Sequence, residues 1–253
     1  MLKAENITVK YGDKVIVDDL SFHLREGQWL MLAGPNGAGK STLIHAISQG
    51  VRYSGSITLG GKNISKYRTV QLAEKIGVLS QKNNVGYSFT VEEVVSLGRY
   101  AHSRGFFAGK DDAGEQRVEA ALELTGLSAL RNASVLTLSG GELQRTFLAQ
   151  VFAQDPEILI LDEPANHLDL VYQKHIFSLI GEWLKQPGRA VLSVVHDLSL
   201  ARCYGTHAVL MNRGKCVAQG AINEVMSREN LRAVYDMDVY AWMNEMFTRW
   251  QDA

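Results

Sequence analysis

Apolar runs of strand length alternate with segments of helical periodicity along much of this chain. Residues 2–11 show partial alternation and β-branched side chains, which predicts an antiparallel strand ending at Tyr11-Gly12-Asp13. Further strands are expected at 29–33, 55–59, 76–79, 158–163 and 190–195, with a closing hairpin around Arg213-Gly214 and short helices with aromatic anchors in the last thirty residues. Helices are expected at 40–48, 69–75 and 170–185, so the pattern predicts an α/β fold.

The strand pattern stops between Lys82 and Asp155, where helical periodicity takes over. The expected helices lie near 91–96, 114–125 and 140–154. In the last of them, Leu143, Phe147, Leu148 and Val151 fall on one face, as core residues do. This stretch is therefore predicted to be a helical subdomain.

Composition is that of an ordinary globular protein, with 46% hydrophobic and 21% charged residues among 253. The net charge of −1 gives no electrostatic reason to expect a nucleic acid partner. The N-terminus lacks the layout of a signal peptide, and no window approaches about 18 consecutive apolar residues. A membrane role is therefore expected only through a partner.

The two cysteines, Cys203 and Cys216, match no metal-binding spacing. They are interpreted as buried, reduced thiols of a cytosolic protein.

One segment fits the phosphate-binding pattern G-x-x-x-x-G-K-[ST] at every required position. It consists of Gly34, Pro35, Asn36, Gly37, Ala38, Gly39, Lys40 and Ser41, followed by Thr42. A buried strand precedes it and a helix follows, so backbone N–H groups and the helix N-terminus can face an anion. Lys40 is expected at the β- and γ-phosphates and the Ser41 hydroxyl on Mg²⁺.

A second glycine turn, Leu138-Ser139-Gly140-Gly141-Glu142, stands before the last expected helix of the subdomain. Taken alone, this turn fits a plain helix cap better than a second anion-binding nest. Both interpretations use the Ser139 side chain and the N–H groups of Gly140 and Gly141.

Paired acids stand at the C-terminal end of the strand expected at 158–163, the end where open α/β sheets place their ligands. Asp162 is suited to hold Mg²⁺ and Glu163 to orient or deprotonate an attacking water. The alternative is a solvated strand end, which the phosphate-binding motif disfavours. His196 ends another strand and could sense a γ-phosphate, although an isolated histidine is more often structural.

Two other positions have both a structural and a functional interpretation. Tyr11 either caps a strand or stacks its ring on adenine. Gln81 follows a strand, where a lone glutamine is usually a loop amide.

The order Tyr11, GPNGAGKST, Gln81, LSGGE, ILILDE, Asp169 and His196 resembles the nucleotide-binding subunit of ATP-binding cassette (ABC) transporters across essentially the whole chain. The resemblance implies a P-loop NTPase core with an antiparallel β-subdomain at 1–83 and 155–253, and a helical subdomain carrying LSGGE at 84–154. It makes Tyr11 the adenine-stacking ring, Gln81 a contact to Mg²⁺ and water, and Glu163 the catalytic glutamate. His196 becomes the switch histidine.

The family works as a head-to-tail homodimer that holds two ATP molecules, each between one P-loop and the partner's LSGG turn. This implies that Ser139, Gly140, Gly141 and Glu142 face the partner's nucleotide and that Asp169 lies in the loop bridging the two sites. Many members have Gln where this chain has Glu142. Because the nest is made by Ser139 and the glycines, Glu142 is expected to be tolerated.

The segment 89–102 and the single-cassette length are similar to ATPases of type II importers, which move iron–siderophore, haem or cobalamin. That resemblance implies a permease dimer, a substrate-binding protein, and a peripheral position on the cytoplasmic face of the cell membrane. One rival is a soluble ABC ATPase of DNA repair, chromosome structure or translation, whose usual insertions are not visible here. Another is a P-loop kinase, which gives no reason for LSGGE.

Overall fold

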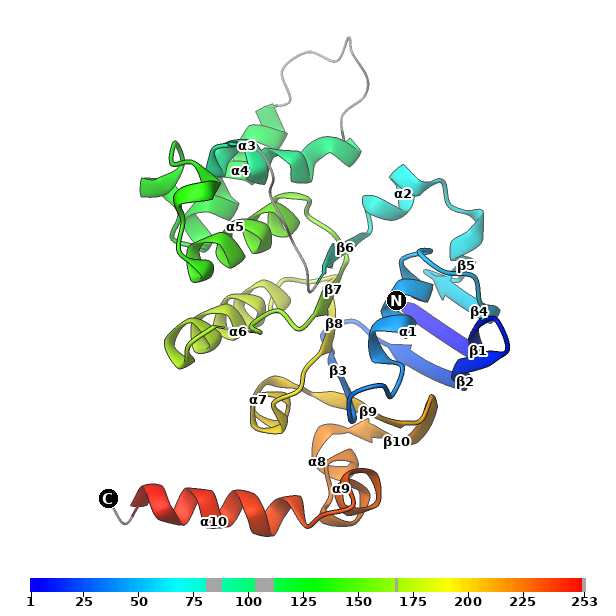
Figure 1. Ribbon diagram of the computed structural model, residues 1–253. Helices are drawn as coiled ribbons and strands as arrows, with labels where there is room; N and C mark the ends of the chain where they lie inside the picture. Colours follow the sequence, from blue (N-terminus) through cyan, green and yellow to red (C-terminus); the bar gives the residue numbers. More distant parts are fainter. Residues whose placement is uncertain (81–87, 103–111, 167, 252–253) are drawn as a thin grey trace. The chain divides into compact units, whose positions relative to one another are not determined.

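The computed structural model describes residues 1–80, 88–102, 112–166 and 168–251 (Figure 1). The chain forms two compact units, and each is treated by itself. The first unit holds residues 1–24, 28–61 and 194–253, and the second holds 25–27 and 62–193. The helical subdomain expected at 84–154 lies within the second unit, and its predicted bounds stay a prediction.

An antiparallel sheet in the first unit has the strand order β2-β1-β4. β1 (Leu2–Tyr11) pairs with β2 (Lys14–Leu24) on one side and with β4 (Ser54–Leu59) on the other. β2 was not predicted, because its alternation slips where the β1–β2 register shifts and Asp19 adopts a left-handed φ of 52°. The antiparallel character expected for residues 2–11 is confirmed.

A second set of strands in the first unit has the order β10-β9-β3. The fully buried β3 (Trp29–Ala33) runs parallel to β9 (His207–Asn212), which pairs antiparallel with β10 (Lys215–Ala221). The predicted hairpin is confirmed, and its two turn residues, Arg213 and Gly214, both have positive φ. α1 (Lys40–Ile47) follows β3 and packs against β1 and β2.

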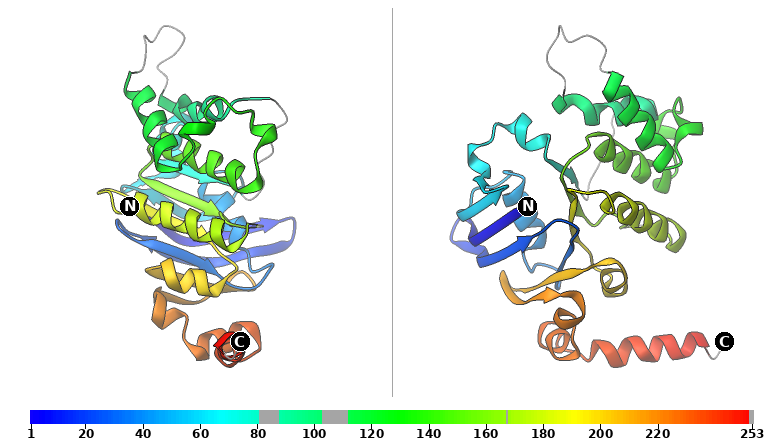
Figure 2. Two further views of the ribbon diagram at one scale, coloured as in Figure 1. Left: turned by 90° about the vertical axis from the view of Figure 1, so that its left-hand side faces the viewer. Right: turned by 180° about the vertical axis from the view of Figure 1, so that it is seen from behind.

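α7 (Leu198–Tyr204) lies between β8 (Ala190–Val194) and β9 along the chain and was not predicted. The short helices α8 (Ile222–Val225), α9 (Arg228–Tyr235) and α10 (Val239–Gln251) end the first unit, which confirms the helices expected in the last thirty residues. Tyr240 of α10 is an aromatic anchor, because its hydroxyl accepts from Arg202 Nη1 at 2.5 Å and donates to the Met226 carbonyl at 2.8 Å. Trp250 is not an anchor, since 81% of it is exposed. α10 runs outward from α9 and carries the C-terminus at its far end (Figure 2).

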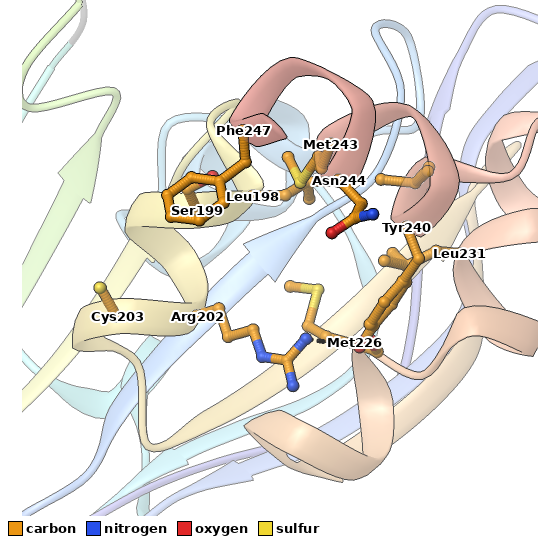
Figure 3. Close-up of a pocket in the computed structure, with 11 residues that line it drawn as sticks. Leu198, Ser199, Arg202, Cys203, Met226, Leu231, Tyr240, Met243, Asn244 and Phe247 are labelled. Atoms are coloured by element: carbon orange, nitrogen blue, oxygen red, sulfur yellow. Dashed lines mark hydrogen bonds between the residues drawn. The ribbon is translucent and has the colours of Figure 1, made fainter. Parts of the chain in front are cut away.

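A groove of about 580 Å³ lies along α7 and α10 in the first unit (Figure 3). Leu198, Met226, Leu231, Met243 and Phe247 give it a largely apolar lining, and Arg202 and Tyr240 add polar groups. The predicted nucleotide-binding residues are absent from this lining, so the groove is separate from the candidate site.

The second unit contains the strand order β8-β7-β6. β6 (Ile76–Leu79) runs parallel to β7 (Ile158–Asp162), and both β7 and β8 (Ala190–Val194) are buried along their whole length. All three runs were predicted as strands, and the structure confirms them. The small elements β5 (Lys62–Asn63) and α2 (Thr69–Ala73) come before β6.

Three helices of the second unit pack on one another: α3 (Val91–Leu97), α4 (Asp112–Leu124) and α5 (Gly140–Ala153). Phe147, Leu148 and Val151 of the predicted stripe are buried, whereas Leu143 is only half-buried. α6 (Leu170–Leu184) follows β7, as predicted. The α/β fold class is therefore confirmed.

The thiol prediction is wrong in one respect. Cys203 is exposed and Cys216 is half-buried, and both are free. Ala201 is the buried residue of α7, and β10 has no buried residue, so these two side chains lie toward the surface. In the described residues, every helix is too short or too polar to cross a membrane.

Candidate functional site

The phosphate-binding motif forms the loop between β3 and α1 in the first unit. Gly34 has φ +141°, and a Cβ there would lie 2.1 Å from the Met211 carbonyl oxygen of β9. Gly39 has φ +100°, and its Cβ would lie 2.7 Å from the Ile16 carbonyl oxygen of β2. Only glycine fits at both places, because β9 and β2 leave no room for a side chain and the backbone angles are unfavourable to L residues.

Lys40 points back into this loop rather than out to solvent. Its ammonium donates to the carbonyl oxygens of Gly34 at 2.7 Å and Pro35 at 3.0 Å, and only 5% of the residue is exposed. The cation is thus held at the mouth of the loop, at the N-terminus of α1, whose first turn contains no acidic residue. Together the cation and the helix N-terminus favour a bound anion.

Tyr11 lies at the end of the β1–β2 hairpin, where it pairs with Lys14 and is 52% exposed. The hairpin borders the phosphate loop, because Ile16 of β2 is the residue whose carbonyl closes off Gly39. The ring is therefore a surface aromatic on an element that contacts the loop. Its predicted contact with adenine stays a prediction.

Tyr235, at the end of α9, is a residue that the sequence did not indicate. The Gly34 backbone amide hydrogen-bonds to its hydroxyl, and burial raises the pKa of that hydroxyl above its ordinary value. α9 thus contacts the first glycine of the phosphate loop. Local pattern could not reveal this contact, since it joins residues far apart in the chain.

The LSGGE turn in the second unit forms the N-terminus of α5. Ser139 is the N-cap, and the Glu142 Oε2 atom accepts from the Ser139 N–H and the Ser139 hydroxyl, both at 2.8 Å. These two hydrogen bonds, the backbone one first, lower the pKa of the Glu142 carboxyl. The interpretation of this turn as a helix cap is therefore confirmed. The expected contact of Ser139 with a phosphate stays a prediction.

Gly141 is buried against α6. A Cβ at this position would lie 2.7 Å from the Tyr172 ring, so the turn and the ring fit together only with glycine. Gly140, in contrast, has open space where a Cβ would be. Asp169 is the N-cap of the same helix, and its carboxylate accepts from the Tyr172 N–H at 3.0 Å.

The paired acids lie where β7 ends in the second unit. Asp162 is the last residue of the strand, with 5% exposed, and Glu163 follows with a left-handed φ of 54°. The Glu163 Oε2 atom accepts a hydrogen bond of 2.6 Å from the Asn166 side-chain amide. The sequence did not indicate Asn166.

The predicted site residues divide between the two units. Tyr11, the phosphate loop and His196 belong to the first unit, and His196 is exposed directly before Asp197, the N-cap of α7. Asp162, Glu163, Asp169 and the Ser139 turn belong to the second. Gln81 lies outside the described residues.

Residues 17–166 match the protein family described as ABC transporter. The chain belongs to this family. The predicted resemblance is confirmed, and with it the P-loop NTPase fold. ABC transporter ATP-binding subunits are ATPases coupled to transport, so the assignment as a transport ATPase follows from the family.

Curated ABC relatives include several named as import proteins. The iron(3+)-hydroxamate import ATP-binding protein FhuC of Bacillus subtilis is 36% identical over 94% of this chain and 88% of that protein. The ferric enterobactin transport ATP-binding protein FepC of Escherichia coli is 35% identical, covering 93% and 87%. YvrA of Bacillus subtilis, named an uncharacterized ABC transporter ATP-binding protein, is 38% identical over 96% of this chain, which spans 55% of that protein.

Solved ABC structures share the fold. A chain from a metal-chelate type ABC transporter in an inward-facing conformation aligns with a TM-score of 0.81 and 26% identity, covering 94% of this chain and 89% of that one. A dimeric bacterial ABC cassette, MJ0796, aligns with a TM-score of 0.76 and 26% identity over 88% of this chain and 99% of that one.

Proposed function

We propose that this ABC subunit hydrolyses ATP to power import of a metal chelate, either an iron–siderophore, haem or cobalamin, through a membrane permease. The proposal rests chiefly on similarity to FhuC and FepC, whose names specify iron hydroxamate and ferric enterobactin, over 88% and 87% of their lengths. A hemin import ATP-binding protein of Rhodococcus jostii is also 37% identical over 79% of its length. Because these relatives are named for different substrates, the proposal does not choose among the three kinds of chelate.

Within the proposed ATPase, the loop from Gly34 to Thr42 holds the phosphates. The buried Lys40 ammonium supports this role, since it already lies among loop carbonyls that a phosphate chain can replace. Glu163 orients or deprotonates the attacking water, and His196 senses the γ-phosphate. Tyr11 stacks on the adenine.

The proposed metal is Mg²⁺, which prefers oxygen ligands. Ser41, Gln81 and Asp162 would hold it, directly or through water, and they offer a hydroxyl, an amide and a carboxylate oxygen. The place of Asp162 at the C-terminal end of β7 fits this donor set, because open α/β sheets place their ligands at that end of the strands. When bound, Mg²⁺ would neutralise charge on the phosphates.

The proposed working form is a head-to-tail homodimer in which ATP closes the two protomers. Ser139, Gly140, Gly141 and Glu142 would face the partner's nucleotide, and Asp169 would lie between the two sites. The dimeric MJ0796 cassette supports the dimer itself through its similarity to this chain, and the head-to-tail order and the ATP-driven closure are part of the proposal.

The proposed partner is a permease dimer, to which a substrate-binding protein delivers the chelate, and nucleic acid has no part. The docking surface would lie between Gln81 and His102, and the subunit would sit at the cytoplasmic face of the membrane. Phe89 is 39% exposed, as a docking residue should be, while Val85 and Tyr87 lie outside the described residues. Asp substitution of these three residues should uncouple transport while ATP binding is retained.

Co-purification of a polytopic membrane subunit tests the proposal. The complex, reconstituted in vesicles with its binding protein, should take up one of four probes when ATP is supplied: ferric hydroxamate, ferric enterobactin, haem or cobalamin. Glu163→Gln should abolish the uptake. If the isolated subunit hydrolyses ATP but binds no membrane protein, the transport assignment is wrong.

A further inference from the structure

The loop that follows β7 holds its acidic residue through a side chain three positions later. The Asn166 Nδ2 atom donates to Glu163 Oε2 at 2.6 Å, which is short for a nitrogen donor. The Asn166 backbone N–H also donates to the Glu163 carbonyl at 3.2 Å, which closes a turn. Two bonds therefore join the same pair of residues, and only one of them involves the carboxylate.

The backbone of Glu163 explains why such a bond is useful. Its φ of 54° lies in the left-handed region, which non-glycine residues enter only at a cost, and such strain is concentrated at functional sites. A glutamate side chain on this backbone still has three rotatable bonds. A donor fixed on Oε2 removes most of that freedom and sets the plane of the carboxylate.

Other contacts fix the two sides of the loop. The Gln144 side chain of α5 donates to the Pro164 carbonyl oxygen at 2.7 Å. Asp169 caps α6 through the Tyr172 N–H. Asn166 lies between these anchors and is exposed, so its contact with Glu163 is not imposed by core packing.

We propose that Asn166 is a positioning residue for the hydrolytic reaction. Its side-chain amide holds the Glu163 carboxylate in the orientation that activates water, and the other carboxylate oxygen is thereby aimed. This inference rests on the proposed function, in which Glu163 acts on the attacking water. A general base must lie within hydrogen-bond distance of the water and be oriented toward it. A small misplacement of a reacting group can lower the rate by up to about a hundredfold.

The test uses two variants that remove the donor and one that keeps it. Asn166→Ala deletes the amide, and Asn166→Asp keeps its shape but replaces the donor by an acceptor. Both should lower kcat for ATP by about tenfold or more, while KM changes by less than about twofold. Asn166→Gln keeps the donor on a longer stem and should recover part of kcat. Asn132→Ala, an exposed asparagine of the same unit, is the matched control and should leave kcat unchanged.

A double variant separates positioning from a general loss of structure. If Asn166 acts through Glu163, adding Asn166→Ala to Glu163→Gln should not lower the residual hydrolysis further. A further drop equal to that of the single variant would overturn the inference. So would an unchanged kcat in both Asn166→Ala and Asn166→Asp.

The failure of the inference can be told from failure of the proposed function. If Glu163→Gln stops hydrolysis and the Asn166 variants do not slow it, only the role of Asn166 is wrong. If Glu163→Gln hydrolyses ATP normally, the catalytic assignment of Glu163 fails, and the role of Asn166 fails with it.

Discussion

The Gln144 side-chain amide donates a hydrogen bond of 2.7 Å to the carbonyl oxygen of Pro164. Gln144 belongs to α5, the helix that begins at the LSGGE turn, and Pro164 directly follows Glu163. Within one protomer, therefore, the helix that begins at the LSGGE turn is hydrogen-bonded to the backbone beside the proposed catalytic glutamate.

Loss of this bond should slow ATP hydrolysis. Gln144→Ala leaves a partly buried carbonyl without its donor, which should cost about 1 kcal/mol in stability and loosen the loop that carries Glu163. We expect kcat to fall several-fold with nucleotide affinity retained. Gln150→Ala, on the same helix, is the control. Equal kcat values for the two variants would argue against a catalytic effect of the bond.

Glu163 is expected to be the residue on which hydrolysis depends most. Glu163→Gln should bind ATP but hydrolyse it at least ~10²-fold more slowly, the scale expected for a lost general base. The ATP-bound dimer should then accumulate, which size-exclusion chromatography with ATP can detect. Glu74→Gln, an exposed glutamate of the same unit, should behave as the unmodified protein. Normal turnover in Glu163→Gln would rule out the assignment.

The structure also explains which parts could be predicted from the sequence. The phosphate loop was predictable because it is local: Gly34, Gly39 and Lys40 lie within a few residues, and their spacing follows from the loop's own geometry. β7 and β8 were predictable because each is a short run of mainly apolar residues.

The parts that were missed depend on backbone irregularity or on distant contacts. β2 was missed because the positive φ of Asp19 and the register shifts break its alternation of buried and exposed side chains. The contact of Tyr235 with Gly34 joins the two ends of the chain, so no window of sequence contains it. The bond from Asn166 to Glu163 is local, but it depends on the left-handed backbone of Glu163, for which the sequence carries no signal.

Adenine binding is expected to depend on the Tyr11 ring and not on its hydroxyl. Tyr11→Ala should weaken nucleotide binding by about 1–3 kcal/mol, by analogy with base–aromatic stacking, and Tyr11→Phe should bind as well as the unmodified protein. Because stacking selects poorly among bases, GTP should also be bound. Isothermal titration with both nucleotides measures this. An unchanged ATP affinity in Tyr11→Ala would return Tyr11 to a structural role.

The cap of α5 should weaken in acid. The pKa of Glu142 is held below its ordinary value of 4.5 by the Ser139 N–H and hydroxyl. The stabilisation is therefore complete above the unfolded-state pKa, and it is lost as the pH falls through the lower pKa of the folded state. The difference in free energy of unfolding between this protein and Glu142→Gln should shift as the pH falls from above 4.5 through the lower pKa of the folded state. A difference independent of pH would contradict the contribution of the ionised cap.

The last prediction is that Ser139 acts on the partner's nucleotide. The phosphate loop and the Ser139 turn belong to different units of the chain, and each presents N–H groups at a helix N-terminus. A Lys40→Ala protomer can be mixed with a Ser139→Arg protomer. In a trans arrangement, the sound phosphate loop of the Ser139→Arg chain faces the sound turn of the Lys40→Ala chain, so one intact site survives in each mixed dimer.

In a cis arrangement, every site of that mixed dimer contains a defect. Nucleotide occlusion is the better measurement, because turnover could require both sites to act together. Mixed dimers isolated with two different affinity tags should occlude about one ATP each, whereas neither parent homodimer should occlude any. The unmodified homodimer, carrying the same tags, sets the full value. Verified heterodimers that occlude no ATP would count against the trans arrangement, because their one complete composite site should have held it.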